Sequence, residues 1–205
     1  MFFDQVNSSF YTKEQQELLA QAHIGIAGAG GLGSNCAMIL ARAGVTHFTL
    51  IDFDEVNTSN LNRQFYFASQ INEIKVEALA QNLKNINPDI SLTIYNQRVT
   101  ASNAKELLKR SSIVIEAFDT PQSKATLAQI YLFDSQTPFI CVSGIAGFGN
   151  SDRIITQEVG RNSWLIGDTS TGVDKAPPLA PAVLIAAAKE ADKVLEIILL
   201  NTQKK

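Results

Sequence analysis

Cysteine is scarce in this chain of 205 residues, which contains only Cys36 and Cys141. The two do not form a CxxC pair, so a cysteine-rich zinc site and a disulfide scaffold are both excluded. Cys141 lies in an apolar segment and Cys36 in an expected helix, so we expect both to be unreactive residues of the core. We therefore expect no zinc in this protein.

Long apolar runs are missing as well. No stretch of about 18 apolar residues occurs, so we expect no membrane-spanning helix and no membrane partner. Residues 1–10 contain neither a basic residue nor an apolar run, which differs from a secretory signal peptide. These absences predict a cytoplasmic protein.

An excess of positive charge is also lacking. Lys and Arg number 17 and Asp and Glu number 20, which gives a formal net charge of −3 at pH 7. Such a chain is poorly suited to bind nucleic acid through bulk charge, and we expect no nucleic-acid partner. The content of 45% hydrophobic and 18% charged residues is typical of a globular protein and not of a disordered one.

Short apolar segments alternate with helical patterns along most of the chain. We expect five strands, at residues 23–28, 46–51, 91–95, 112–117 and 138–142. We expect helices at residues 12–22, 34–43, 74–86, 104–109, 121–133 and 181–200. This rhythm predicts an α/β fold with a Rossmann-like, doubly wound and mostly parallel sheet. Residues 144–163 contain short β-like runs, for which we expect an antiparallel extension of the sheet toward the C-terminus.

A glycine-rich turn follows the first expected strand. Gly28, Gly30 and Gly33 match the pattern G-x-G-x-x-G, and Gly31 lies within it. Glycines let the backbone approach phosphate closely, and the free N–H groups at the start of the next helix face the anion. Asp52 ends the next expected strand, where a carboxylate can hold ribose hydroxyls and disfavours a 2′-phosphate. The motif predicts a nucleotide site and leaves NAD, FAD and ATP open.

Polar residues after Asp52 favour ATP among these nucleotides. An Asn-, Arg- and Gln-rich stretch runs to residue 64, and Lys75 follows at the start of an expected helix. A triphosphate needs such amide and cationic groups beyond its first phosphate, whereas a dehydrogenase does not. Asp54 could assist a metal ion or cap the loop.

Asp119 follows the fourth expected strand, at the edge of the sheet where such folds bind ligands. Its carboxylate could hold Mg²⁺. The alternative is that it caps the helix that begins near Pro121, because Asp is favoured at that position. Capping would not prevent metal binding.

Four motifs resemble the ThiF/MoeB/HesA family of ubiquitin-activating-like enzymes and extend over about residues 22–200. They are GAGGLGS, DFDEVNTSNLNRQ, EIKVEAL and EAFDT. Two more segments, GIAGFGNS and WLIGD, are similar to the short stand-alone form of ThiF. The resemblance implies an enzyme that uses MgATP to adenylate the C-terminal carboxylate of a ubiquitin-fold sulfur carrier, in particular ThiS of thiamine biosynthesis. A MoaD-like carrier of molybdopterin synthesis, a small molecule or a tRNA base stays open as substrate, although the charge of −3 disfavours tRNA.

The resemblance also implies a role for each candidate residue. Gly30 and Gly31 would line the phosphate turn, Asp52 would hold the ribose, and Asp119 would position Mg²⁺. The residues implied to contact the phosphates are Asn60, Arg63, Gln64 and Lys75. The residues implied to be catalytic are Arg63, Lys75 and Asp119. The attacking carboxylate is already ionised, so this chemistry needs no general base.

One domain over residues 1–205 is expected from the resemblance. Its parts would be an N-terminal helix (1–22), a nucleotide-binding half (23–143) and a carrier-docking half with a crossover loop and a closing helix (144–205). A homodimer is also implied, although residues 1–22 lack the arginine that several relatives send into the partner subunit and contain only Lys13. Residues 167–172 form a loop of small residues that could clamp the carrier tail, with the edge of the strand at 138–142 pairing with it, or that could be an ordinary surface loop.

Two rival functions share the glycine turn. An NAD-dependent oxidoreductase would need a proton-transfer residue near the site, and none is visible. His23 and His47 each begin an expected strand, where we expect structural roles. A non-catalytic nucleotide-dependent adaptor would not need both Arg63 and Lys75.

Overall fold

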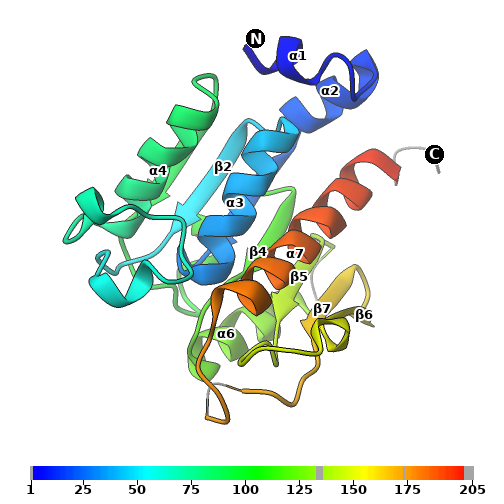
Figure 1. Cartoon of the computed structure of the whole chain (residues 1–205). Helices are drawn as coiled ribbons and strands as arrows, with labels where there is room; N and C mark the ends of the chain where they lie inside the picture. The colour runs from blue at the N-terminus through cyan, green and yellow to red at the C-terminus, as the bar shows by residue number, and fades with distance from the viewer. Residues whose placement is uncertain (1, 133–135, 173, 201–205) are drawn as a thin grey trace.

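The computed structural model of the chain describes residues 2–132, 136–172 and 174–200. A seven-stranded sheet with the order β3-β2-β1-β4-β5-β7-β6 runs through its centre (Figure 1). The strands are β1 (His23–Ala27), β2 (His47–Ile51), β3 (Ser91–Tyr95), β4 (Ile113–Glu116), β5 (Phe139–Val142), β6 (Ile155–Gly160) and β7 (Ser163–Gly167). All neighbours pair in parallel except β6 and β7, which are antiparallel. The expected Rossmann-like α/β fold with an antiparallel extension is confirmed.

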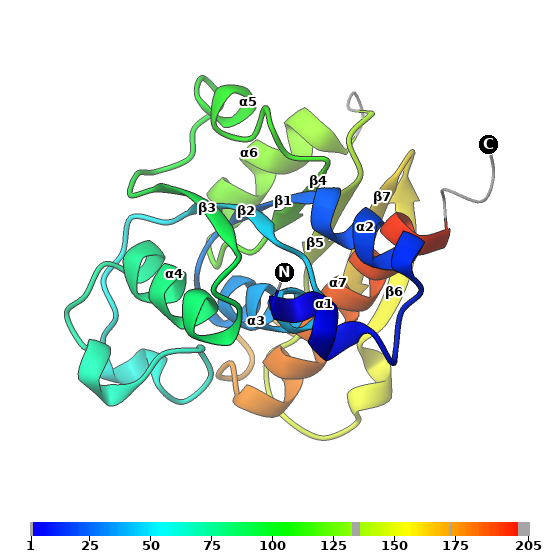
Figure 2. The ribbon, with the colours of Figure 1, turned by 90° about the horizontal axis from the view of Figure 1, so that it is seen from above.

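Helices cover both faces of the sheet, as Figure 2 shows. One face carries α3 (Gly31–Ala43), α4 (Lys75–Ile86) and α7 (Ala180–Leu200). The other face carries α5 (Ala104–Leu107) and α6 (Pro121–Tyr131). Single 3₁₀ turns lie at η1 (Thr58–Asn60), η2 (Ala68–Gln70) and η3 (Ser151–Arg153). Because both faces are covered, the central strands are apolar nearly throughout.

The close pair of α3 and α7 dominates the core on one face of the sheet (Figure 1). Small side chains are buried on both helices, which lets them approach closely: Cys36, Ala37 and Ala41 on α3, and Ala186, Ala187 and Ala191 on α7. Glu190 of α7 is also fully buried, and within the described residues its carboxyl has no hydrogen-bond partner. Burial, and then the nearby charge of Glu116, raise the pKa of Glu190 well above its ordinary value.

The ends of α3 agree only partly with the expected helix over 34–43. Gly44 closes it as expected, with φ of 106° and an N–H that donates to the carbonyls of Leu40 and Ala41. The helix begins at Gly31, three residues earlier than expected, with Gly30 extended at the N-cap. Glycines disfavour helix by propensity, but a side chain at Gly31 would meet Val183 and one at Gly33 would meet the carbonyl of Gly28.

The N-terminal segment forms two helices, α1 (Phe2–Asn7) and α2 (Lys13–Gln21), and the sequence pattern predicted only the second. Thr12 separates them by capping α2: its hydroxyl accepts the Gln15 N–H (3.2 Å) and its N–H donates to the Gln15 side chain (2.9 Å). Asn7 fixes α1 to the end of α3 by donating to the carbonyl of Ala43 (3.2 Å).

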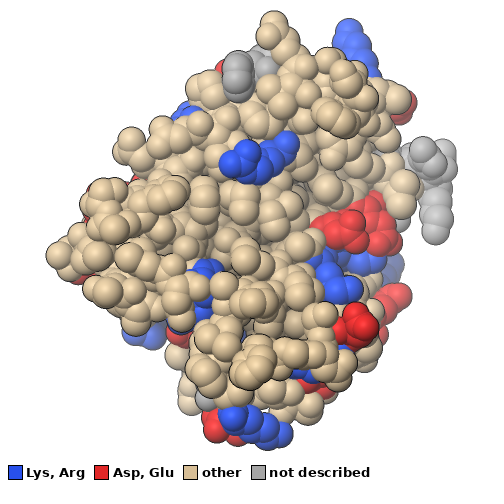
Figure 3. Space-filling view, viewed as in Figure 1, with Lys and Arg blue, Asp and Glu red and all other residues tan. Residues whose placement is uncertain are grey.

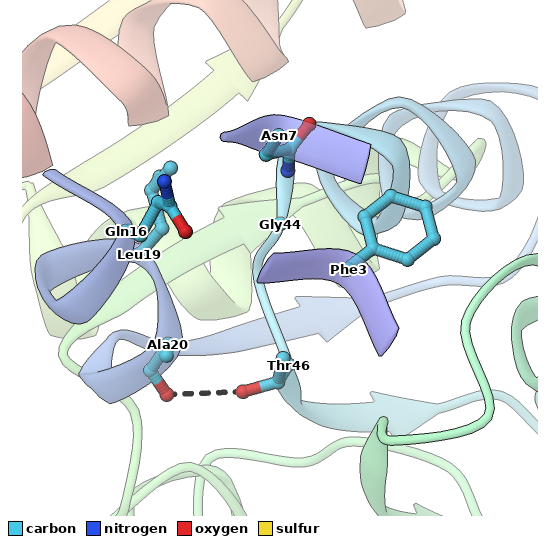
Figure 4. A pocket seen from close by; sticks show the side chains of 7 residues that line it. All are labelled: Phe3, Asn7, Gln16, Leu19, Ala20, Gly44 and Thr46. Atoms are coloured by element: carbon cyan, nitrogen blue, oxygen red, sulfur yellow. Dashed lines mark hydrogen bonds between the residues drawn. The ribbon is translucent and has the colours of Figure 1, made fainter. Parts of the chain in front are cut away.

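A cavity of about 10 Å³ lies beneath α1, which is about the space of one water molecule. Its lining residues are Phe3, Asn7, Gln16, Leu19, Ala20, Gly44 and Thr46 (Figure 4). Thr46 donates to the carbonyl of Ala20 across it (3.0 Å). The cavity is too small for a substrate, and these contacts attach the N-terminal helices to the domain.

Other expectations can be placed on the structure as well. Cys36 is buried and Cys141 half-buried; burial raises the pKa of both thiols, to about 12 for Cys141. His23 bonds the hydroxyl of Thr49 (2.8 Å) and His47 the carbonyl of Ala20 (2.9 Å), so both rings have structural partners at the amino ends of β1 and β2.

Within the described residues, none of the helices combines the length and the apolar character that a membrane span requires. Residue 133 of the expected helix 121–133, residue 173 of the expected loop and residues 201–205 of the expected C-terminal half lie outside the described residues.

Candidate functional site

The site lies at the carboxyl ends of β1, β2 and β4. The chain leaves β1 toward β2 on one side and leaves β4 toward β5 on the other, so the sheet has its switch point between β1 and β4. Folds of this kind bind ligands in the crevice outside such a switch point. The glycine turn follows β1, Asp52 directly follows β2, and Asp119 lies three residues beyond the end of β4.

Two glycines of the turn are required by its geometry. Gly28 has φ of 108°, and a Cβ there would lie 2.5 Å from the carbonyl oxygen of Ala117 just beyond β4. A Cβ on Gly33 would lie 1.8 Å from the carbonyl oxygen of Gly28. Their missing side chains allow the turn to pack between β4 and α3.

The other two glycines differ from each other. A Cβ on Gly30 would meet only one described atom, Nε2 of Gln64, at 3.9 Å, so there is free space beside Gly30. A Cβ on Gly31 would lie 2.9 Å from Cγ1 of Val183 on α7 and 3.5 Å from Cγ of Arg63. Gly30 therefore leaves room that suits a phosphate, whereas Gly31 brings the first turn of α3 against α7 and the stem of Arg63.

Asp52 is half-buried and connects β2 to the glycine turn. Its Oδ2 accepts the N–H of Ala29 (2.7 Å) and its Oδ1 the N–H of Asp54 (2.9 Å). Burial raises its pKa, and these backbone bonds together with Lys75 act in the opposite direction. An ionised carboxylate has about four acceptor positions, so two remain for ribose hydroxyls.

Asn60 shapes the turn that carries the next two candidates. It is buried, and its Oδ1 accepts the N–H of Asn57 (3.0 Å). Its carbonyl accepts the N–H groups of Arg63 (3.1 Å) and Gln64 (2.9 Å). The structure gives Asn60 this turn-forming role, and its expected contact with phosphate stays a prediction.

Arg63 and Gln64 both lie beside the glycine turn. The guanidinium of Arg63 donates to the carbonyl of Ser59 (3.1 Å) and to Oδ1 of Asn62 (2.8 Å). Gln64 is buried, and among the described residues its Oε1 has no hydrogen-bond partner. Unpaired buried amide oxygens are uncommon in folded proteins, so this one fits a ligand donor or a bound water.

Lys75 is nearly buried at the first residue of α4, with 5% of its surface exposed. Its Nζ lies 2.9 Å from Oδ2 of Asp54, and its N–H donates to the carbonyl of Asp54. The positive end of the helix dipole disfavours a cation at this position, and the carboxylate offsets that cost. The expectation for Asp54 was metal binding or loop capping; the contact observed is the ion pair with Lys75.

Asp119 is exposed beyond the end of β4. In the part of the chain that the structure describes, its carboxylate forms no hydrogen bond or ion pair, and no three His, Cys, Asp or Glu residues gather as a metal-binding group. Thr120, not Asp119, caps α6 by accepting the N–H of Ser123 (3.4 Å), so the capping alternative for Asp119 was wrong. A free carboxylate is a ligand type that suits Mg²⁺.

Two residues of α3 that the sequence reasoning missed bind the backbone of residues 63–65. Ser34 donates to the carbonyl of Gly30 (2.6 Å) and accepts the N–H of Phe65 (3.0 Å). Asn35 donates to the carbonyls of Gly31 (2.6 Å) and Arg63 (2.8 Å). Polar residues in the first turns of an otherwise apolar helix were the available signal.

Arg153 and Asp168 form a second missed pair, beyond β5 and β7. Arg153 donates to Oδ2 of Asp168 (2.6 Å) and to the carbonyl of Ala146 (2.7 Å). Burial opposes ionisation of Asp168, but hydrogen bonds from Thr171, Ser170 and Arg153 outweigh it, so the pKa of Asp168 lies well below its usual range. The pair fixes the start of the loop that runs to α7.

The edge of β5, expected to pair with a carrier tail, is not free. β5 lies between β4 and β7, with hydrogen bonds to both. The expectation was wrong because residues 163–167 form β7, a parallel strand that the sequence did not predict there. The outermost strands of the sheet are β3 and β6.

Comparisons with known proteins agree with this architecture. The model of the ThiF family matches residues 3–203. The tRNA threonylcarbamoyladenosine dehydratase of Escherichia coli (strain K12) is 34% identical over 139 residues, 67% of this chain and 52% of the relative. The sulfur carrier protein ThiS adenylyltransferase of the same strain is 35% identical over 144 residues, 69% of this chain and 56% of the relative. The matched part of the chain thus spans about half the length of these curated relatives.

A crystal structure of the E. coli tRNA N6-threonylcarbamoyladenosine dehydratase in complex with ATP shares the fold. Its TM-score is 0.87 at 21% identity, and the match covers 98% of this chain and 95% of that one. The sheet, the glycine turn and the match over nearly the whole sequence lead to one assignment: the chain belongs to the ThiF family.

Proposed function

We propose that the chain is an ATP-dependent adenylyltransferase that activates a carboxylate as an acyl-adenylate. The observation that carries the proposal is the free space beside Gly30, which the side chain of Gln64 borders; the Oε1 of Gln64 is unpaired within the described residues. Asp52 lies one strand away and keeps acceptor capacity for a ribose. Membership of the ThiF family supports the same chemistry.

The reaction needs no nucleophile or base from the protein. An oxygen of the ionised substrate carboxylate attacks the α-phosphorus of ATP, and the bond from that phosphorus to the bridging oxygen breaks. Pyrophosphate leaves with the electron pair, which gives R–CO–AMP. The chain contributes charge and orientation: N–H groups of the glycine turn and the guanidinium of Arg63 face the phosphates.

Lys75 contributes a cation that is already held in position by Asp54. In this proposal Nζ of Lys75 passes from Asp54 to a phosphate oxygen, while its buried stem stays at the start of α4. Mg²⁺ would be held by Asp119 together with phosphate oxygens, where it neutralises the charge of the phosphates.

The proposed substrate is the C-terminal glycine carboxylate of a ThiS-like, ubiquitin-fold sulfur carrier in thiamine biosynthesis. The ThiS adenylyltransferase relative supports this choice. In this proposal residues 23–143 bind the nucleotide and residues 144–205 dock the carrier. The enzyme would act as a homodimer in the cytoplasm.

A carboxylate carried by a tRNA base is the second candidate, because the tRNA threonylcarbamoyladenosine dehydratase is about equally similar. Net charge argues against it, since the chain carries −3. On the face seen in Figure 3, the Lys and Arg side chains of the described residues are scattered, some beside Asp and Glu and others among uncharged residues. Nucleic-acid binding would favour a continuous basic surface there.

One set of incubations separates these possibilities. The full chain is mixed with ATP, Mg²⁺ and a purified ThiS, MoaD or tRNA substrate, and the intact mass of each substrate is measured for added AMP. AMP on ThiS, together with ATP–pyrophosphate exchange, is expected. AMP on MoaD or on tRNA alone would overturn the thiamine assignment and keep the chemistry. No exchange with any substrate would overturn the adenylyltransferase, and NADH binding in its place would favour the oxidoreductase.

A further inference from the structure

Tyr66 touches the glycine turn although it belongs to none of the expected site residues. Only 6% of its surface is exposed. Its hydroxyl donates to the carbonyl of Ala29 (2.7 Å), and the same oxygen lies 3.3 Å from the carbonyl of Lys75. A hydroxyl has one proton, so the shorter contact is the main bond and the longer one a weak branch. One side chain thus connects the turn to the first residue of α4.

The bond to Ala29 also determines where a neighbouring donor points. A trans peptide group is planar, and its C=O and N–H point in opposite directions. The described residues contain no cis peptide bond, so fixing the carbonyl of Ala29 also fixes the N–H of Gly30. Among the described residues that N–H has no hydrogen-bond partner, and it lies next to the free space at Gly30.

Hydrogen bonds also fix the other backbone group of Ala29 and the residue that precedes Tyr66. The N–H of Ala29 donates to Asp52 (2.7 Å), so both backbone groups of Ala29 have a partner. Residue Phe65, directly before Tyr66, is bonded through its N–H to Ser34 and through its carbonyl to Asn82 (2.9 Å). Burial moves the pKa of Tyr66 far above its ordinary value, so the hydroxyl stays a neutral donor.

We infer that Tyr66 is a positioning residue, which turns the N–H of Gly30 toward the nucleotide phosphates by holding the carbonyl of Ala29. The inference rests on the proposed function, because it assigns a phosphate to the space beside Gly30. Tyr66 does not touch the substrate itself. Its effect is confined to ligands that carry phosphate.

The test is the variant Tyr66→Phe in the full chain, which removes only the hydroxyl oxygen. Binding of ATP with Mg²⁺ and binding of adenosine are measured by calorimetry. We expect the Kd for ATP to rise about 3- to 10-fold, the usual effect of one hydrogen bond, and the Kd for adenosine to stay the same. Tyr131→Phe is the matched control, since Tyr131 is equally buried at 6% but stacks on Phe139 on the opposite face of the sheet; it should change neither Kd.

Equal affinity of wild type and Tyr66→Phe for ATP would overturn the inference. Equal weakening of ATP and adenosine would also overturn it, since that is the result of a general structural role. A readout without nucleotide keeps the two proposals distinct: amide hydrogen exchange at Ala29, whose N–H is bonded to Asp52, should be about 3- to 10-fold faster in the variant. Unchanged amide hydrogen exchange in Tyr66→Phe would count against the role of Tyr66. A wild-type protein that binds no ATP would count against the proposed function.

Discussion

Lys75 shows how the protein keeps a cation in an unfavourable place. Its ammonium group is buried and lies at the positive end of α4, and the Asp54 carboxylate at 2.9 Å offsets both costs. A phosphate that binds Lys75 would compete with Asp54 for the same ammonium. Asp54, which is about half-exposed, can then return to water at little cost.

Asp119 gives the sharpest prediction at the scale of single residues. Asp119→Ala should reduce ATP–pyrophosphate exchange at least about 100-fold, because the carboxylate that is proposed to hold Mg²⁺ is removed. The stability to urea should change by less than about 0.5 kcal/mol, since the side chain is exposed and unbonded within the described structure. Asp192→Ala, which removes an exposed carboxylate on α7, is the control and should keep full exchange. Wild-type exchange in Asp119→Ala would exclude the metal role.

At the scale of elements, α7 contains the carboxyl of Glu190, whose ionisation is unfavourable in the folded chain. The pKa of Glu190 is higher in the folded than in the unfolded chain, so between the two values the folded state holds a proton that the unfolded state has lost. Stability therefore falls as pH rises above the unfolded pKa of about 4.3. The groups that act on Glu190 are Glu116, which adds to the effect, and Lys124, which opposes it.

Glu190→Gln should remove this loss, because glutamine has the same shape and does not ionise. Urea unfolding is measured for both proteins at pH 4.5, 6 and 7.5. At pH 4.5 the wild type and Glu190→Gln should have nearly equal free energies of unfolding. As pH rises, the free energy of unfolding of the variant should exceed that of the wild type, by at most about 1.4 kcal/mol per pH unit. Glu196→Gln, on an exposed part of the same helix, should show no such gain. A gain that does not depend on pH would contradict the role of ionisation.

The cap of α2 is a separate element with a separate expectation. Thr12→Ala removes the acceptor for the N–H of Gln15 and should cost about 1 kcal/mol in urea unfolding. Thr12→Ser keeps the oxygen and should behave like the wild type. An alanine variant with unchanged stability would mean that α2 is held by its packing alone.

Local patterns predicted the elements and the nucleotide motif, whereas contacts between distant segments could not be predicted. The expected strands and the helix closed by Gly44 depend on spacing that a short window contains. β7 was missed because its pairing with β5 depends on residues that are far apart in sequence. The same holds for the bonds from Tyr66 to Ala29 and from Arg153 to Asp168: Tyr66 and Arg153 lie outside the quoted motifs, and only the folded chain brings the partners together.

At the scale of the whole molecule, the glycine turn depends on packing against α7. Gly31→Ala would place a Cβ 2.9 Å from Cγ1 of Val183, so it should displace the start of α7 and weaken ATP binding. Val183→Ala should cost stability by leaving a cavity. The double variant should bind ATP better than Gly31→Ala alone, because the smaller side chain at position 183 makes room for the methyl group added at position 31. Strictly additive effects on stability and binding would contradict a direct contact.

This contact also has a consequence for how the protein is made. Val183 follows Gly31 by 152 positions, so the glycine turn leaves the ribosome well before α7. Until α7 has emerged, the small residues of α3 that α7 covers lack this packing. The nucleotide motif is synthesised well before α7, yet it becomes a fully packed site only together with α7. We therefore expect a nascent chain to bind ATP only after α7 has been translated.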